Sequence, residues 1–146
     1  MVIAAIAYAM CRLAFGGNAS WEDDPYSLTI PTHFTGVGQV RSGSVGMTLD
    51  HRAPCTVQVS VANGGDEVLT CSGDTLLTQY KLTGLMLEGG GDATWVDSST
   101  FRTKVYTIVG DGKGVVMTLW VQATSASARA NNAGTYSASV ILTLVF

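Results

Sequence analysis

Charge is scarce in this chain of 146 residues, of which Asp, Glu, Lys and Arg together make up only 13%. The eight basic residues are scattered, no two of them are adjacent, and the formal net charge is −3. Proteins that recognise nucleic acids draw most of their affinity from clustered Lys and Arg side chains. The composition therefore excludes nucleic acid as a partner.

Catalytic side chains are scarce as well, since the chain has only two histidines, His33 and His51. Nucleophilic catalysis usually needs a His base that is held by a carboxylate. His33 closely follows Pro31, and His51 lies in the polar sequence Asp50-His51-Arg52, so we interpret both as solvated turn residues. Neither a Gly-x-Ser-x-Gly nor a His-Glu-x-x-His motif is present. We expect no catalytic site and no enzyme.

Clustered metal ligands are also lacking. Cys55, Cys71 and His51 could in principle supply three zinc ligands, but the chain has no Cys-x-x-Cys pair. The acidic run Glu22-Asp23-Asp24 and the later Asp92 follow no EF-hand pattern. We therefore expect neither a metal site nor a cofactor.

An apolar stretch, Met1–Phe15, opens the chain and carries a single charge at Arg12. A helix needs roughly 20 apolar residues to span a bilayer, so we expect no stable membrane span. The length is typical of the core of a secretion signal, although no basic residue precedes it, and a retained structural segment is the alternative. We expect a leader over residues 1–19, cleaved or retained, and one secreted or cell-surface domain over residues 20–146.

Alternation of apolar and polar residues is the strongest structural pattern in the rest of the chain. It is cleanest in Cys55–Val61 and recurs in Thr135–Phe146. Thr103–Val109 and Val115–Val121 flank the glycine-rich residues 110–114, which predicts a hairpin. About seven to nine short strands predict an all-β fold, an antiparallel β-sandwich without a helix after the leader. The other expected elements are strands over residues 26–30, 44–50, 67–71 and 78–87 and a flexible loop at 89–92.

Cysteine usage favours an oxidising compartment, because Cys55 and Cys71 form an even pair once Cys11 in the leader is set apart. A tight turn at Asn63–Asp66 would leave the Cα atoms of the pair roughly 13 Å apart, beyond the limit of about 7 Å for a disulfide. The tight turn and the disulfide therefore exclude each other. We expect the disulfide Cys55–Cys71, with a longer connection between the two strands.

The C-terminal sequence resembles a known family. The segment Ala133-Gly-Thr-Tyr-Ser-Ala-Ser-Val-Ile-Leu-Thr-Leu-Val-Phe146 is similar to the closing strand of the spore coat protein U family, whose members typically end in Ala-Gly-x-Tyr, alternating Val and Thr, and a terminal aromatic residue. Cys55-Thr-Val and Val68-Leu-Thr-Cys71 resemble the two cysteine regions of that family. The segment Thr94–Val109 and the leader depart from its pattern.

The resemblance implies an Ig-like, pilin-like sandwich that lacks one strand, since the family includes subunits of archaic chaperone–usher pili. In such subunits an N-terminal extension of the next copy fills the open groove. Tyr26, Leu28 and Ile30 are candidates for this donor strand, and pairing within their own subunit is the alternative. The closing strand has nothing after it to pair on its far side, and one of its faces is expected to carry Tyr136, Val140, Leu142, Leu144 and Phe146.

These observations predict a structural subunit of an extracellular fibre or surface assembly, joined by donor-strand complementation. Its expected partners are copies of itself in a homopolymer and a periplasmic chaperone. The alternative is a self-contained secreted module that binds carbohydrate or protein through loops such as Glu88–Trp95. In that case Trp21, Trp95 and Trp120 could stack on sugar rings. Alternation places Trp120 opposite its apolar neighbours on the same strand, so we expect it to be half exposed.

Overall fold

Antiparallel strands make up most of the described chain, which confirms the all-β prediction. The Ig-like and pilin-like details of the sandwich stay a prediction. The computed structural model describes residues 19–22, 26–28, 30, 37–51, 57–61, 68–109, 112–125 and 136–145.

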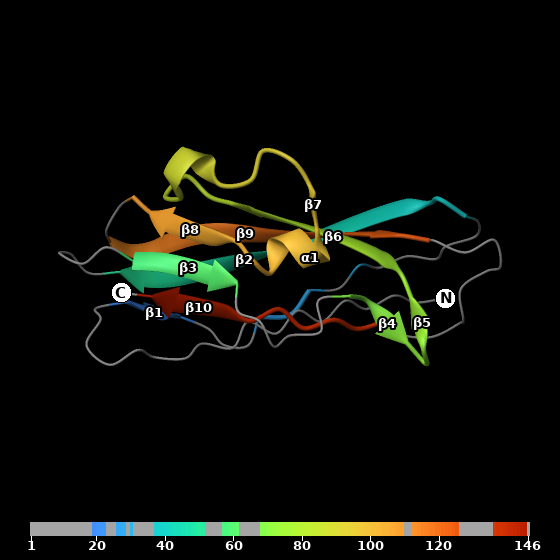
Figure 1. Cartoon of the computed structure of the whole chain (residues 1–146). Coiled ribbons are helices and arrows are strands. Elements are labelled where there is room, and N and C mark those ends of the chain that lie inside the picture. Colours follow the sequence, from blue (N-terminus) through green and yellow to red (C-terminus); the bar gives the residue numbers. More distant parts are fainter. Residues whose placement is uncertain are drawn as a thin grey trace.

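The larger sheet has five strands in the order β1-β2-β9-β6-β7 (Figure 1). Its centre is formed by two long strands, β2 (Val40–His51) and β9 (Gly112–Thr124), which pair from Val40↔Thr124 onward with a register shift between Leu49 and His51. The remaining strands of this sheet are β1 (Ala19–Trp21), β6 (Leu77–Thr83) and β7 (Val96–Asp97).

The smaller sheet has three strands in the order β10-β3-β8. The central strand is β3 (Val57–Val61), which pairs with β10 (Leu142–Val145) on one side and with β8 (Val105–Ile108) on the other. A two-stranded ladder joins β4 (Thr70–Cys71) to β5 (Asp74–Thr75).

Alternation decides which face of each strand is buried. In β9, Met117, Leu119 and Val121 are at most 1% exposed, whereas the residues between them are half-buried. Buried side chains of both sheets belong to one hydrophobic cluster, so the sheets share a core and remove their apolar faces from water together. The smaller sheet contributes Val59, Tyr106, Ile108, Leu142 and Leu144 to this cluster.

The predicted hairpin around residues 110–114 is wrong. β8 pairs with β3 in the smaller sheet, whereas β9 pairs with β2 and β6 in the larger one, so the chain changes sheets between Ile108 and Gly112. Two alternating segments joined by glycines are compatible with any antiparallel partner. Here β9 lies between two other strands of its sheet, which leaves no edge of β9 for β8.

The predicted loop at 89–92 begins within an exposed 3-10 turn, η1 (Glu88–Gly90), which is followed by Gly91, and its flexibility stays a prediction. Gly89, Gly90 and Gly91 all have positive φ angles, of 67°, 80° and 87°. A Cβ atom added at Gly91 would lie 2.2 Å from the carbonyl oxygen of Leu82. Only glycine allows this approach of the two backbones.

A short helix, α1 (Ser98–Phe101), corrects the expectation that no helix follows the leader. Phe101 is fully buried and stacks on Tyr80 of β6, with 4.8 Å between the ring centroids. A helix of one turn is too short for a 3.6-residue period to be visible in the sequence.

Candidate functional site

The N-terminal segment is anchored on β2. β1 pairs with β2 in antiparallel register, with Ser20 opposite Asp50 and Trp21 opposite Leu49. Beyond β1, the hydroxyl of Tyr26 donates to the carbonyl oxygen of Thr48 at 3.0 Å and accepts from its amide nitrogen at 3.1 Å. The phenol thereby pairs with both backbone groups of Thr48, whose carbonyl oxygen also accepts from the backbone nitrogen of Glu22 at 2.9 Å.

The predicted donor residues are inserted into the core of their own chain. Tyr26, Leu28 and Ile30 are 8%, 4% and 1% exposed, whereas Ser27 is exposed. The alternation that predicted a strand is therefore present in the burial pattern. In contrast to the prediction, the described residues of this segment belong to neither sheet. The segment contributes apolar side chains to the core without being part of a β-ladder.

The closing strand, β10, is an edge strand of the smaller sheet (Figure 1). β10 pairs with β3, with Leu144 opposite Val59, and among the described strands it has no second partner. Its predicted alternation holds in the described residues, because Tyr136, Val140, Leu142 and Leu144 are at most 1% exposed. Phe146 lies outside the described residues.

The two cysteines of the predicted disulfide are only partly described. Cys71 is a free, half-buried cysteine at the end of β4, and Cys55 lies outside the described residues. β3 pairs with β8 and β10 rather than with β4, so the two strands do not form the tight hairpin that would exclude the disulfide. No disulfide is formed in the described part of the chain, and the pairing stays a prediction.

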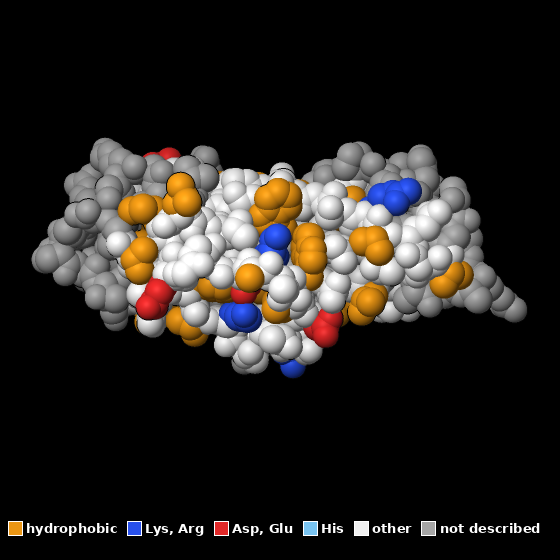
Figure 2. Space-filling view, turned by 90° about the horizontal axis from the view of Figure 1, so that it is seen from above, with side chains coloured by type: hydrophobic (Ala, Val, Ile, Leu, Met, Phe, Trp, Pro, Cys, Tyr) orange, Lys and Arg blue, Asp and Glu red, His pale blue; other side chains and the backbone are white. Residues whose placement is uncertain are grey.

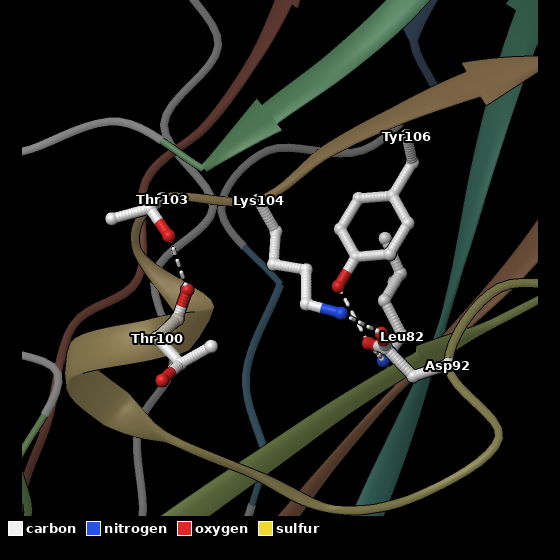
Figure 3. Close-up of polar contacts among 6 residues, drawn as sticks. All are labelled: Leu82, Asp92, Thr100, Thr103, Lys104 and Tyr106. Carbon is white, nitrogen blue, oxygen red and sulfur yellow. Dashed lines mark hydrogen bonds and ion pairs between the residues drawn. The ribbon is translucent and has the colours of Figure 1, made fainter.

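A buried polar cluster joins the two sheets (Figure 3). One carboxylate oxygen of Asp92, Oδ2, accepts from the backbone nitrogen of Leu82 at 3.0 Å and from the hydroxyl of Tyr106 at 2.5 Å. The other oxygen, Oδ1, accepts from Nζ of Lys104 at 2.7 Å. The side chain of Asp92 is 4% exposed and that of Lys104 is 33% exposed. Three donors therefore engage the two oxygens of this carboxylate.

The chemistry of this cluster is that of a structural link. Burial, the hydrogen bond to Asp92 and its negative charge raise the pKa of Tyr106 well above its usual value, so the phenol stays protonated and donates to the carboxylate. From the sequence, Asp92 was considered only as a loop carboxylate that could bind calcium. In the residues that the structure describes, no three His, Cys, Asp or Glu side chains are grouped so that they could hold a metal ion.

The three tryptophans lie in different environments. Trp21 is buried and contacts the ring of Tyr26 edge-on, whereas Trp95 and Trp120 are half-buried on the outside of the larger sheet. The prediction of a half-exposed Trp120 is confirmed. Alternation alone did not predict that Trp120 and Trp95 lie on either side of Lys81. This arrangement depends on the register between strands that are distant in the sequence.

No protein-family model matches the chain, and no curated protein is similar to it. The resemblance to the spore coat protein U family therefore rests on the sequence motifs alone. Among the described elements, none is a helix of the length and apolar character that a membrane crossing requires.

Proposed function

We propose that the protein is a structural subunit of an extracellular fibre or surface assembly, and that its copies are joined by donor-strand complementation. The observation that carries the proposal is the position of Tyr26, Leu28 and Ile30, which fill the core while their segment belongs to neither sheet. A segment of this kind from a second copy makes the same contacts, so exchange between copies changes little of the core.

The edge of β10 supports this assignment. Its backbone is paired with β3 on one side only within the described strands, and Leu142 and Leu144 already face the core. An extended segment from another copy gains backbone hydrogen bonds by adding to such an edge. Exchange in a head-to-tail sense then gives an open chain of subunits.

The polar side chains in the interior favour a structural role over catalysis. Asp92, Lys104 and Tyr106 are engaged with one another, and the hydroxyl of Tyr136 donates to Asp74 at 2.5 Å. Groups that are saturated by hydrogen bonds hold the fold together and are poorly available to a substrate.

A cysteine pair across β1 and β2 tests the exchange. Ser20 and Asp50 are register partners, and Cα atoms of such partners lie about 4.5–5.5 Å apart, within disulfide range. We expect the variant Ser20→Cys with Asp50→Cys, in a background with Cys11, Cys55 and Cys71 changed to Ser, to give a ladder of disulfide-linked multimers on non-reducing gels. In an exchanged assembly the disulfide joins two chains.

The matched control is Ser20→Cys with Ser99→Cys in the same background, which carries two surface thiols that are not register partners. It is expected to show no ladder. A double variant Ser20→Cys with Asp50→Cys that is fully oxidised but runs only as a monomer contradicts the proposal, because its N-terminal segment then stays on its own chain.

A further inference from the structure

The outer face of the larger sheet carries a row of side chains that neither the core nor the proposed assembly uses. Register pairing places Ser44 of β2, Trp120 of β9 and Lys81 of β6 side by side across three strands. Nζ of Lys81 lies 5.3 Å from the ring centroid of Trp95 and 5.5 Å from that of Trp120. Figure 2 shows hydrophobic and basic side chains gathered near the middle of this face.

Lys81 has no ion-pair or hydrogen-bond partner among the described residues. Its ammonium group is held between two indole faces, which attract the positive charge through their quadrupoles. The indole rings offer no conventional acceptor for its three N–H donors. The charge and the donors of Lys81 are therefore available to a ligand that approaches from solvent.

Trp120 is fixed in position before any ligand binds. Its Nε1 donates to Oγ1 of Thr83 at 3.0 Å, so the ring is tied to the neighbouring strand β6. The centroids of Trp95 and Trp120 are at most about 11 Å apart, because each lies within 5.5 Å of the same nitrogen. One oligomeric ligand can therefore contact both rings, and a preorganised ring loses little entropy on binding.

Polar side chains continue the face toward β7. Nε2 of Gln122 donates to Oε1 of Gln79 at 3.1 Å, and Nε2 of Gln79 donates to Oδ1 of Asp97 at 3.0 Å. Asp97 also lines an open hollow of about 440 Å³ next to Leu77 and Ser98.

Sugar chains match this combination of groups. A sugar ring has an apolar C–H face that stacks on an indole, and its hydroxyls pair with amides and carboxylates such as those of Gln79, Gln122 and Asp97. The ammonium group of Lys81, which has no partner of this kind among the described residues, favours a sugar that carries a carboxylate, since a charge-assisted hydrogen bond is stronger than a neutral one.

We propose that this face binds an acidic polysaccharide, with sugar rings on Trp95 and Trp120 and a uronate carboxylate on Lys81. The hydrogen-bonded side chains Gln122, Gln79 and Asp97 contact the hydroxyls of the neighbouring sugar. This glycan site goes beyond the proposed assembly and does not depend on it, because no residue of the site belongs to the N-terminal segment or to β10.

Titration of the full chain with hexagalacturonate tests the site, with calorimetry and tryptophan fluorescence as readouts. We expect saturable binding that is weakened by salt, and a roughly tenfold loss of affinity in Lys81→Gln, the usual effect of losing one charge-assisted hydrogen bond. Trp95→Ala is expected to weaken binding by a similar factor. The matched control Arg102→Gln removes an exposed cation at the C-cap of α1 and is expected to bind as the unaltered protein does.

The fully methyl-esterified hexamer keeps the sugar rings but has no carboxylates, so it distinguishes the contribution of the charge from that of the rings. We expect it to bind at least tenfold more weakly than hexagalacturonate. In the unaltered protein, unesterified hexagalacturonate should also protect the tryptophan fluorescence from quenching by acrylamide. This readout needs no variant. Absence of binding, equal affinity for the ester, or unchanged affinity in Lys81→Gln overturns the proposal. The disulfide ladder of Ser20→Cys with Asp50→Cys is a separate readout, so failure of the glycan site leaves the assembly proposal standing.

Discussion

At the scale of single residues, Asp92 makes polar contacts with both sheets. It accepts from the backbone of Leu82 in the larger sheet and from Tyr106 in the smaller one, while Lys104 balances its charge. The sequence gives little sign of this role, because an Asp after three glycines is typical of an exposed turn. What fixes its position is the close approach of Gly91 to Leu82, a contact between backbones that only the folded chain brings together.

Replacement of this carboxylate tests its structural role. We expect Asp92→Ala to lower the free energy of unfolding by roughly 3 kcal/mol, because a buried backbone N–H and a buried phenol lose their acceptor. Urea denaturation followed by tryptophan fluorescence measures the change. Asp97→Ala, which removes an exposed carboxylate with one hydrogen bond to Gln79, is the control and is expected to change stability by about 0.5 kcal/mol or less. Equal effects of the two substitutions would refute the structural role.

At the scale of elements, alternation identified strands more reliably than it identified their partners. The segments that became β2, β3, β6 and β9 were all predicted, because burial of one face produces a period of two. The hairpin between β8 and β9 was wrong since the same period fits any antiparallel neighbour. α1 was missed because its single buried residue, Phe101, has no periodic companion.

In the proposed assembly, the N-terminal segment is the element that joins the copies. We expect a synthetic peptide of residues 19–30, added during assembly of the full chain, to occupy the acceptor position and shorten the fibres. A peptide with Leu28→Asp should have no effect, because it places a charge where Leu28 is buried. The control peptide with Ser27→Asp changes an exposed position and should act like the original. Fibre length by electron microscopy is the readout, and equal action of the two altered peptides would count against insertion of the segment.

At the scale of the whole molecule, the proposed assembly region and the proposed glycan site use different parts of the fold. The proposed assembly uses Tyr26, Leu28 and Ile30 and the edge strand β10, whereas Lys81, Trp95 and Trp120 lie on the outer face of the larger sheet. A fibre would therefore repeat the glycan site in every subunit. Repetition raises the avidity for a long polysaccharide even where a single site binds weakly.

Only part of the geometry of the proposed glycan site could be predicted from the sequence. Each of its strands alternates, so the outward positions of Lys81 and Trp120 follow from the pattern. Their adjacency depends on the register of β6 against β9, which joins segments about 40 residues apart. Local sequence does not specify such a register. The register is selected by the packing of all the buried side chains together.

A cryo-EM reconstruction of the native material tests the central proposal most directly. The density for residues 19–30 can be traced from each subunit to the core that it fills. We predict filaments in which this segment enters the neighbouring copy, with Leu28 and Ile30 buried there. Compact monomers, or filaments in which every copy keeps its own segment, would contradict donor-strand complementation.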